Sequence, residues 1–307
     1  MRRLWLYLRL AVLAACLISL AYGCQSDGPI SRDRCLAQPG FVYIPAGAFI
    51  AGSDRAERDY AYQISAEASA DGPEAIAEAE ANLRQRRWFE FELERQTLTL
   101  SALCIAQQPV TNRDYQAFVQ ATGHRSPGIS AADYQVQGFL VHPYTEVEPY
   151  LWAAQQFPAG EADHPVVLVS YADAIAYAQW RGTQDGQSYR LPTAEEWEKA
   201  ARGADGQYFP WGNQWQADAT NWAQQGEYHT SPVNAYPLSR SPYSVDDIAG
   251  NVFEYTSTLE PGRDSQSEVV MKGCSWDDLP GFCRGAYRHK RPQSSRHILF
   301  GFRLVLQ

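Results

Sequence analysis

The C-terminal stretch from Val270 to Val305 constrains the fold more than any other part of the sequence. It begins at a glycine turn and ends in an apolar strand, and an arginine-rich loop lies between the two. Two cysteines, Cys274 and Cys283, flank the dipeptide Pro280-Gly281, which is typical of a turn. Thiol, acidic and cationic side chains are therefore concentrated in one irregular span near the end of the chain.

The other end of the chain carries an export signal. Three arginines precede and flank an apolar run over residues 10–20, which is too short to span a bilayer. We therefore predict a signal peptide over residues 1–23 and an exported, periplasmic protein. Cys24 is followed by Gln-Ser-Asp, as in the acceptor of a bacterial lipoprotein, so we expect lipidation at Cys24 and an anchor in the outer membrane. Cleavage by ordinary signal peptidase is the alternative.

Charge and cysteine content narrow the class of protein further. The formal net charge is -9, and removal of the signal peptide makes it more negative, so we expect no nucleic-acid partner. Four further cysteines remain after Cys24, and in an exported protein they suggest two disulfides with three possible pairings.

The mature sequence shows no repeat or linker that divides it, so we predict one domain over residues 40–307, preceded by a tether over residues 24–39. Helical periodicity from Pro73 to Phe89 lies within an alanine- and charge-rich segment at about 54–95. We interpret that segment as an insertion with a solvated helix on the surface, rather than as a lid over a binding site. A capping box of Thr193 and Glu196 predicts the start of a later helix.

One acidic stretch has the chemistry of a calcium site. Between Asp246 and Tyr255, carboxylates lie on both sides of a glycine turn. Hard oxygen donors at irregular spacing suit calcium better than zinc. The predicted ligands are the side chains of Asp247 and Glu254 and the exposed carbonyls of Gly250 and Val252. A capped turn without metal is the alternative.

Several short motifs resemble those of the formylglycine-generating enzyme (sulfatase-modifying factor) family. They occur in the same order as in that family, from about residue 40 to residue 305. They are Arg190-Leu-Pro-Thr-Ala-Glu-Glu-Trp197, Phe209-Pro-Trp-Gly212, Asn251-Val-Phe-Glu-Tyr255, Gly273-Cys-Ser-Trp276 and Gly301-Phe-Arg303. The resemblance implies an α+β fold, a compact single domain related to C-type lectins and low in regular secondary structure. It also supports calcium at Asp247 and implies a second calcium site at Asn221, Trp222, Glu227 and Tyr228.

The resemblance does not extend to the family's catalytic cysteine pair. In formylglycine-generating enzymes two cysteines hold copper(I) beside a serine. The matching positions here are Ser275, Asp278 and Cys283, which are the candidate catalytic residues. Because a hard carboxylate replaces one thiolate, we do not expect copper. A disulfide between Cys274 and Cys283 is the simpler interpretation in an oxidising compartment.

The remaining cysteines are then predicted to pair with each other. Cys35 lies just ahead of the opening hairpin and Cys104 lies in the next core strand, so the two meet if the hairpin packs against that strand.

These observations favour a calcium-braced binding or regulatory module of the cell envelope, anchored to the membrane through lipid. Its partner would be an envelope protein or a peptide segment. The alternative is an oxidoreductase of the same superfamily, either a divergent formylglycine-generating oxidase or an enzyme of the siderophore-maturation type.

Overall fold

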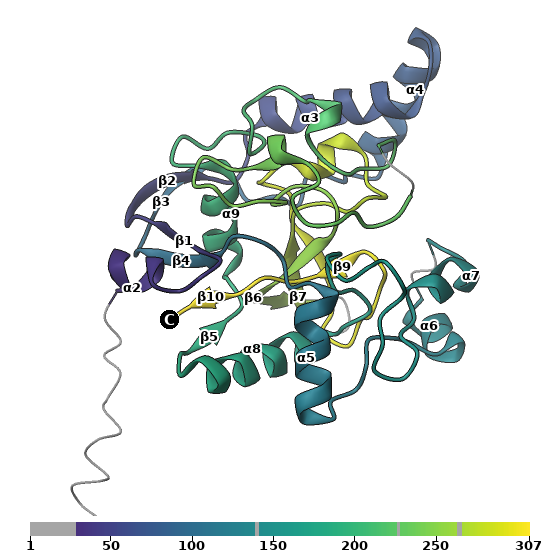
Figure 1. Ribbon diagram of the computed structural model, residues 1–307. Coiled ribbons are helices and arrows are strands. Elements are labelled where there is room, and N and C mark those ends of the chain that lie inside the picture. Colours follow the sequence, from purple (N-terminus) through teal and green to yellow (C-terminus); the bar gives the residue numbers. More distant parts are fainter. Residues whose placement is uncertain (1–28, 139–140, 226–227, 263–265) are drawn as a thin grey trace, which may run out of the picture.

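Helices and short strands alternate along the chain in a computed structural model that describes residues 29–138, 141–225, 228–262 and 266–307 (Figure 1). The strands are β1 (Phe41–Ile44), β2 (Gly47–Ala51), β3 (Gln96–Leu100), β4 (Leu103–Ala106), β5 (Tyr189–Arg190), β6 (Phe253–Pro261), β7 (Ser267–Lys272), β8 (His289–Pro292), β9 (Phe300–Gly301) and β10 (Val305–Leu306). The helices are α2 (Arg32–Leu36), α3 (Arg55–Ser69), α4 (Pro73–Gln85), α5 (Asn112–Thr122), α6 (Ala131–Gln137), α7 (Tyr144–Val147), α8 (Tyr171–Asp185) and α9 (Ala194–Arg202). Short 3-10 turns are η1 (Glu148–Tyr150), η2 (Ala217–Ala219), η3 (Pro237–Ser239) and η4 (Pro280–Cys283). The expected α+β fold is confirmed.

Three small sheets organise the core. The first has the order β1-β4-β10-β5, the second pairs β2 with β3, and the third has the order β8-β7-β6-β9. The C-terminal strand β10 lies inside the first sheet, where Val305 pairs with both Ile105 and Arg190. In the third sheet β9 runs parallel to β6, which brings the last segment of the chain beside the acidic stretch before β6.

The segment expected to be a tether is partly folded. Residues 32–36 form α2, capped by the side chain of Ser31, and Cys35 is buried. A disulfide joins Cys35 to Cys104 in β4, with 5.5 Å between their Cα atoms, as predicted. Residues 29–39 therefore belong to the domain, because the disulfide holds α2 against the first sheet. The predicted signal peptide and Cys24 lie outside the described residues.

Local signals account for the helix starts. The capping box of Thr193 and Glu196 is present at α9, and matching boxes begin α5 at Thr111 and α8 at Ser170. Trp197 on α9 is buried, with its indole N–H donating to Glu254. Within the described residues no helix is both long and apolar enough to cross a bilayer.

The helical insertion differs from the expectation. The predicted helix is present as α4, which has no buried residue and projects from one edge of the molecule (Figure 1). However, a second helix, α3, precedes it and buries most of one face, including Glu57, Ala61 and Tyr62. The sequence patterns predicted only the helix over residues 73–89, so α3 was missed. Its buried face mixes charged and small residues with Tyr62 and Ile64, and apolar periodicity does not detect this pattern.

Candidate functional site

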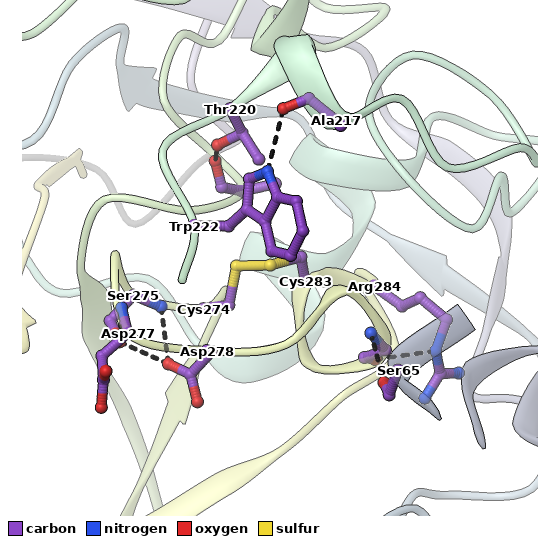
Figure 2. The surroundings of a disulfide bond; sticks show 12 residues. Ser65, Ala217, Thr220, Trp222, Cys274, Ser275, Asp277, Asp278, Cys283 and Arg284 are labelled. Atoms are coloured by element: carbon purple, nitrogen blue, oxygen red, sulfur yellow. Dashed lines mark hydrogen bonds between the residues drawn. A yellow bond between two sulfur atoms is a disulfide. The ribbon is translucent and has the colours of Figure 1, made fainter. Parts of the chain in front are cut away.

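The loop between β7 and β8 holds the second disulfide. Gly273 turns the chain at a φ of 79°, and Cys274 then bonds to Cys283 with 4.7 Å between their Cα atoms, as predicted. Both cysteines are buried, and the indole ring of Trp222 lies against the sulfur atoms (Figure 2). That ring is held by its N–H, which donates to the carbonyl of Ala217 at 2.9 Å. Neither thiol of the pair is available as a thiolate.

Ser275 and Asp278, the other two candidate catalytic residues, contact each other. The backbone N–H of Ser275 donates to Asp278 Oδ2 at 2.9 Å, and the Ser275 hydroxyl donates to the same oxygen. Burial raises the pKa of Asp278 to about 6, and the charge of Asp277 contributes, although the bonds from Ser275 oppose the shift. Asp278 therefore closes a tight turn and lies on one side of the disulfide, whereas Arg284 lies on the other (Figure 2).

The insertion covers the second cysteine of this loop. The N–H of Gly281 donates to Ser65 Oγ on α3 at 2.9 Å. A Cβ atom at Gly281 would lie 2.5 Å from the carbonyl oxygen of Ala61, so α3 approaches the η4 turn as closely as glycine allows. The fully buried guanidinium of Arg284 binds the carboxylates of Glu57 and Glu92, both from the insertion. Helix α3 thus closes the approach to Cys283 from this side.

A buried histidine lies between two carboxylates beside this loop, and no sequence motif predicted it. His142 Nδ1 lies 2.7 Å from Glu146 and His142 Nε2 lies 3.1 Å from Asp277, while its ring lies 5.2 Å from that of Trp276. Burial opposes protonation of His142, but the two carboxylates outweigh it and raise the pKa of the imidazole. His142 and Asp277 are 135 residues apart, and no spacing rule connects them.

The residues of the first predicted calcium set lie in β6 and in the turn before it. Asp247 Oδ2 accepts from the backbone N–H of Asn234 at 2.7 Å. Both oxygens of Glu254 accept from Arg303, each at 2.6 Å. Burial, together with the carboxylates of Asp246 and Glu254, raises the pKa of Asp247 to about 6. A buried carboxylate beside a second one is a fitting partner for a cation, although Arg303 already neutralises Glu254.

The backbone bends sharply in the turn before β6. Asp247 and Gly250 both have positive φ, at 48° and 78°. A Cβ atom at Gly250 would lie 2.5 Å from the carbonyl oxygen of Asn221, so the turn packs closely on the segment that carries the second predicted set. Val252 is buried at the start of β6, and its N–H donates to the Gly250 carbonyl.

The second predicted calcium set is only partly brought together. Asn221 is buried and donates from its amide to the carbonyl of His229. Trp222 covers the disulfide, Tyr228 is 66% exposed, and Glu227 lies outside the described residues. Among the described residues there is no group of three or more His, Cys, Asp or Glu side chains suited to a metal ion. Any calcium here would depend on backbone and amide oxygens.

The chain is similar to known proteins over most of its length. A family model described as sulfatase-modifying factor enzyme 1-like domain matches residues 28–307. The chain is 31% identical over 288 residues to the inactive Cα-formylglycine-generating enzyme 2 of Mus musculus, with 84% of this chain and 80% of the relative covered. It is 30% identical to the formylglycine-generating enzyme of Mycobacterium tuberculosis, covering 68% of this chain and 89% of that one.

A solved structure shows the same fold. PvdO from Pseudomonas aeruginosa superposes with a TM-score of 0.61 at 23% identity, covering 92% of this chain and 100% of that chain. Since the family model spans every described residue and both relatives are at least 30% identical over more than two thirds of this chain, the chain belongs to the FGE-sulfatase family.

Proposed function

We propose that the protein is a binding or regulatory module of the cell envelope that keeps the family's fold and does not form formylglycine. One observation carries the proposal: Cys283 is bonded to Cys274 beneath Trp222, and the position of the other family cysteine is Asp278. A disulfide sulfur has no charge with which to hold copper, and a carboxylate is a hard ligand where a soft one is needed. The similarity to an enzyme named as inactive fits this proposal.

The direct test is an assay for formylglycine. The reduced protein is incubated with copper(I), oxygen and a Cys-x-Pro-x-Arg peptide, and the aldehyde product is sought by mass spectrometry. We expect no product. Turnover that disappears in Cys283→Ser would contradict the proposal and favour an oxidase. The double variant Cys274→Gly with Asp278→Cys is the matched comparison, because it frees Cys283 from the disulfide and places a second cysteine at the position of the missing one.

Calcium is part of the proposal as a structural ion. The side chains of Asp247 and Glu254 and the carbonyls of Gly250 and Val252 would hold it, and its charge would offset the buried carboxylates. Thermal melts in excess calcium should then lie above melts in chelator. The difference should vanish in Asp247→Asn and persist in Asp246→Asn, whose side chain is already paired with Arg240. Equal melting temperatures with and without calcium in the native protein would exclude the ion.

The location at the envelope depends on Cys24. Cys24→Ser should release the protein from the membrane fraction if this residue carries lipid, and unchanged fractionation would rule out an anchor there. The partner in this proposal is an envelope protein or an extended peptide segment that lies over the loop containing Ser275.

A different oxidoreductase is the second candidate, and the His142 cluster is what favours it. An imidazole between two carboxylates, beside the position of the family's catalytic loop, is suited to proton transfer. Oxygen uptake that persists in Cys283→Ser and is lost in His142→Gln would establish this candidate over the binding module.

A further inference from the structure

A buried histidine connects two parts of the chain that are 135 residues apart. The side chain of His142 is 7% exposed, and its ring lies between Glu146, on α7, and Asp277, in the loop between β7 and β8. Nδ1 lies 2.7 Å from Glu146 Oε2, and Nε2 lies 3.1 Å from Asp277 Oδ2. Because ionised carboxylates only accept hydrogen bonds, both contacts are satisfied only when both ring nitrogens carry a proton. The two distances therefore match the imidazolium form of His142.

The other groups that face His142 do not neutralise its charge. Tyr134, on α6, donates from its hydroxyl to the carbonyl of His142 at 2.9 Å. The ring of His297 lies 5.7 Å from that of His142. Burial lowers the pKa of His297 to about 3, and the positive charges of His142 and Arg291 contribute, so the His297 ring is neutral. Within the described chain, the two carboxylates are thus the charged partners of the imidazolium.

The segment that follows His142 covers Trp276. Residues 144–150 form α7 and η1, and Glu146 lies within them. Tyr150, in η1, lies nearly parallel to Trp276 with 6.4 Å between the ring centroids, and Trp276 is only 3% exposed. The contact between His142 and the disulfide loop therefore holds this segment at its N-terminal end, where the chain enters α7.

We infer that protonation of His142 controls the closure of this segment over Trp276. A neutral imidazole has one N–H, so one of the two carboxylates then faces a lone pair of the ring. Nδ1 is the nearer nitrogen to its partner, and Glu146 moves with His142 on the same segment, so the contact with Asp277 is the one that is lost. The open state exposes Trp276 to a partner of the loop. The inference does not rest on the proposed function, because closure is a property of the free protein.

The direction of the pH dependence follows from the closed state. Burial opposes protonation of His142, but the hydrogen bonds and charges of Asp277 and Glu146 outweigh it and raise the pKa of the imidazole. Stabilisation of the closed state is therefore complete below about pH 6.5, the ordinary pKa of histidine, and it is lost as the pH rises through the raised pKa. Asp278 has a pKa of about 6, so the experiment has to separate its titration from that of His142.

Amide hydrogen exchange of the mature protein, corrected for the intrinsic effect of pH, tests the inference. The reporters are the backbone amides of Glu146, Glu148 and Leu151, which donate to backbone carbonyls in and next to this segment. We expect their protection to fall about tenfold between about pH 5.5 and pH 8.5, because one charge-assisted hydrogen bond is lost. Protection that does not change with pH would overturn the inference.

Variants assign the effect to His142. His142→Gln should give low protection at every pH, because its side chain is neutral throughout. Asp277→Asn should keep high protection at every pH, because an amide accepts from a protonated ring nitrogen and donates to an unprotonated one. Glu148→Gln, which removes an exposed carboxylate from the same segment, should retain the tenfold change, and so should Asp278→Asn.

Two outcomes with these variants would contradict the inference. If the tenfold change persists in His142→Gln, another group controls closure. If it disappears in Asp278→Asn, the carboxyl of Asp278 is the group that titrates. The formylglycine assay is decided separately, because it measures the chemistry of the cysteines and not the exchange of this segment.

Discussion

Arg284 is the residue that most directly links the insertion to the candidate site. It follows Cys283 in the chain, its guanidinium is fully buried, and its partners Glu57 and Glu92 both come from the insertion. Glu57 also binds Arg202 on α9, so one buried ion network joins the insertion, α9 and the disulfide loop. Removing one member leaves an uncompensated charge in a medium of low dielectric constant.

We predict that Glu92→Gln lowers the free energy of unfolding by about 3–5 kcal/mol, because Arg284 then loses a charged partner in the interior. Glu94→Gln is the matched control: its side chain is 79% exposed, and its pair with Arg58 should contribute less than about 1 kcal/mol. Urea unfolding measures both. Equal losses in the two variants would show that the buried network does not stabilise the fold.

Asp278 has a pH dependence of predictable sign. Its pKa of about 6 exceeds the ordinary value of a carboxyl, so the folded state favours the protonated form. The protonated carboxyl therefore contributes fully to the free energy of unfolding below about pH 4, and this contribution is lost as the pH rises through about 6.

We predict that Asp278→Asn stabilises the protein by about 1–3 kcal/mol above pH 7, and that the gain disappears near pH 4, where the native carboxyl is neutral. Unfolding curves at several pH values test this. Asp218→Asn, at an exposed site, should show no such trend. A gain that stays constant with pH would mean that burial of the Asp278 charge is not its origin.

At the scale of elements, the two helices of the insertion differ in role. Helix α3 packs on the η4 turn and carries the buried Tyr62, whose ring lies 4.7 Å from that of Phe89. Helix α4 has no buried residue, and its end carries Leu83, which is only partly covered. The first helix is part of the core, and the second is an appendage to it.

We predict that Tyr62→Ala costs about 3–5 kcal/mol of stability, because it opens a cavity against Phe89, whereas Leu83→Ala costs about 1 kcal/mol. Chemical denaturation of the two variants provides the measurement. If Leu83→Ala proved as harmful as Tyr62→Ala, α4 would have to be a structural element as well.

At the scale of the whole molecule, the two disulfides restrain loops of very different length. Cys35 and Cys104 are 69 residues apart and connect α2 with the first sheet, whereas Cys274 and Cys283 are 9 residues apart within one loop. A longer closed loop restricts the unfolded chain more strongly. The disulfide that closes the longer loop should therefore contribute more to global stability. The disulfide that closes the shorter loop should mainly fix the conformation of the candidate site.

We predict that Cys35→Ala with Cys104→Ala lowers stability by about 4 kcal/mol, and that Cys274→Ala with Cys283→Ala lowers it by about 3 kcal/mol. Differential scanning calorimetry of the two double variants compares them under one condition. A larger loss in the second variant would indicate that packing around Trp222, and not loop closure, sets the contribution of that disulfide.

Local patterns in the sequence were sufficient for much of the fold. Thr193 and Glu196 cap α9 as predicted, the pairings of Cys35 with Cys104 and of Cys274 with Cys283 are present, and the family model matches residues 28–307. Such features depend on residues that are close in the chain or on motifs that a family preserves.

Only the tertiary structure showed the contacts between distant segments. His142 meets Asp277, Arg303 takes both oxygens of Glu254, and Arg284 reaches into the insertion. Helix α3 is a further example. Its charged residues suggest a solvated face in the sequence, but they are buried, because partners more than a hundred positions away neutralise them in the folded chain. Hydrophobic periodicity records which side chains avoid water, but it carries no information about which buried charge will find its partner, and that pairing is decided when the segments pack.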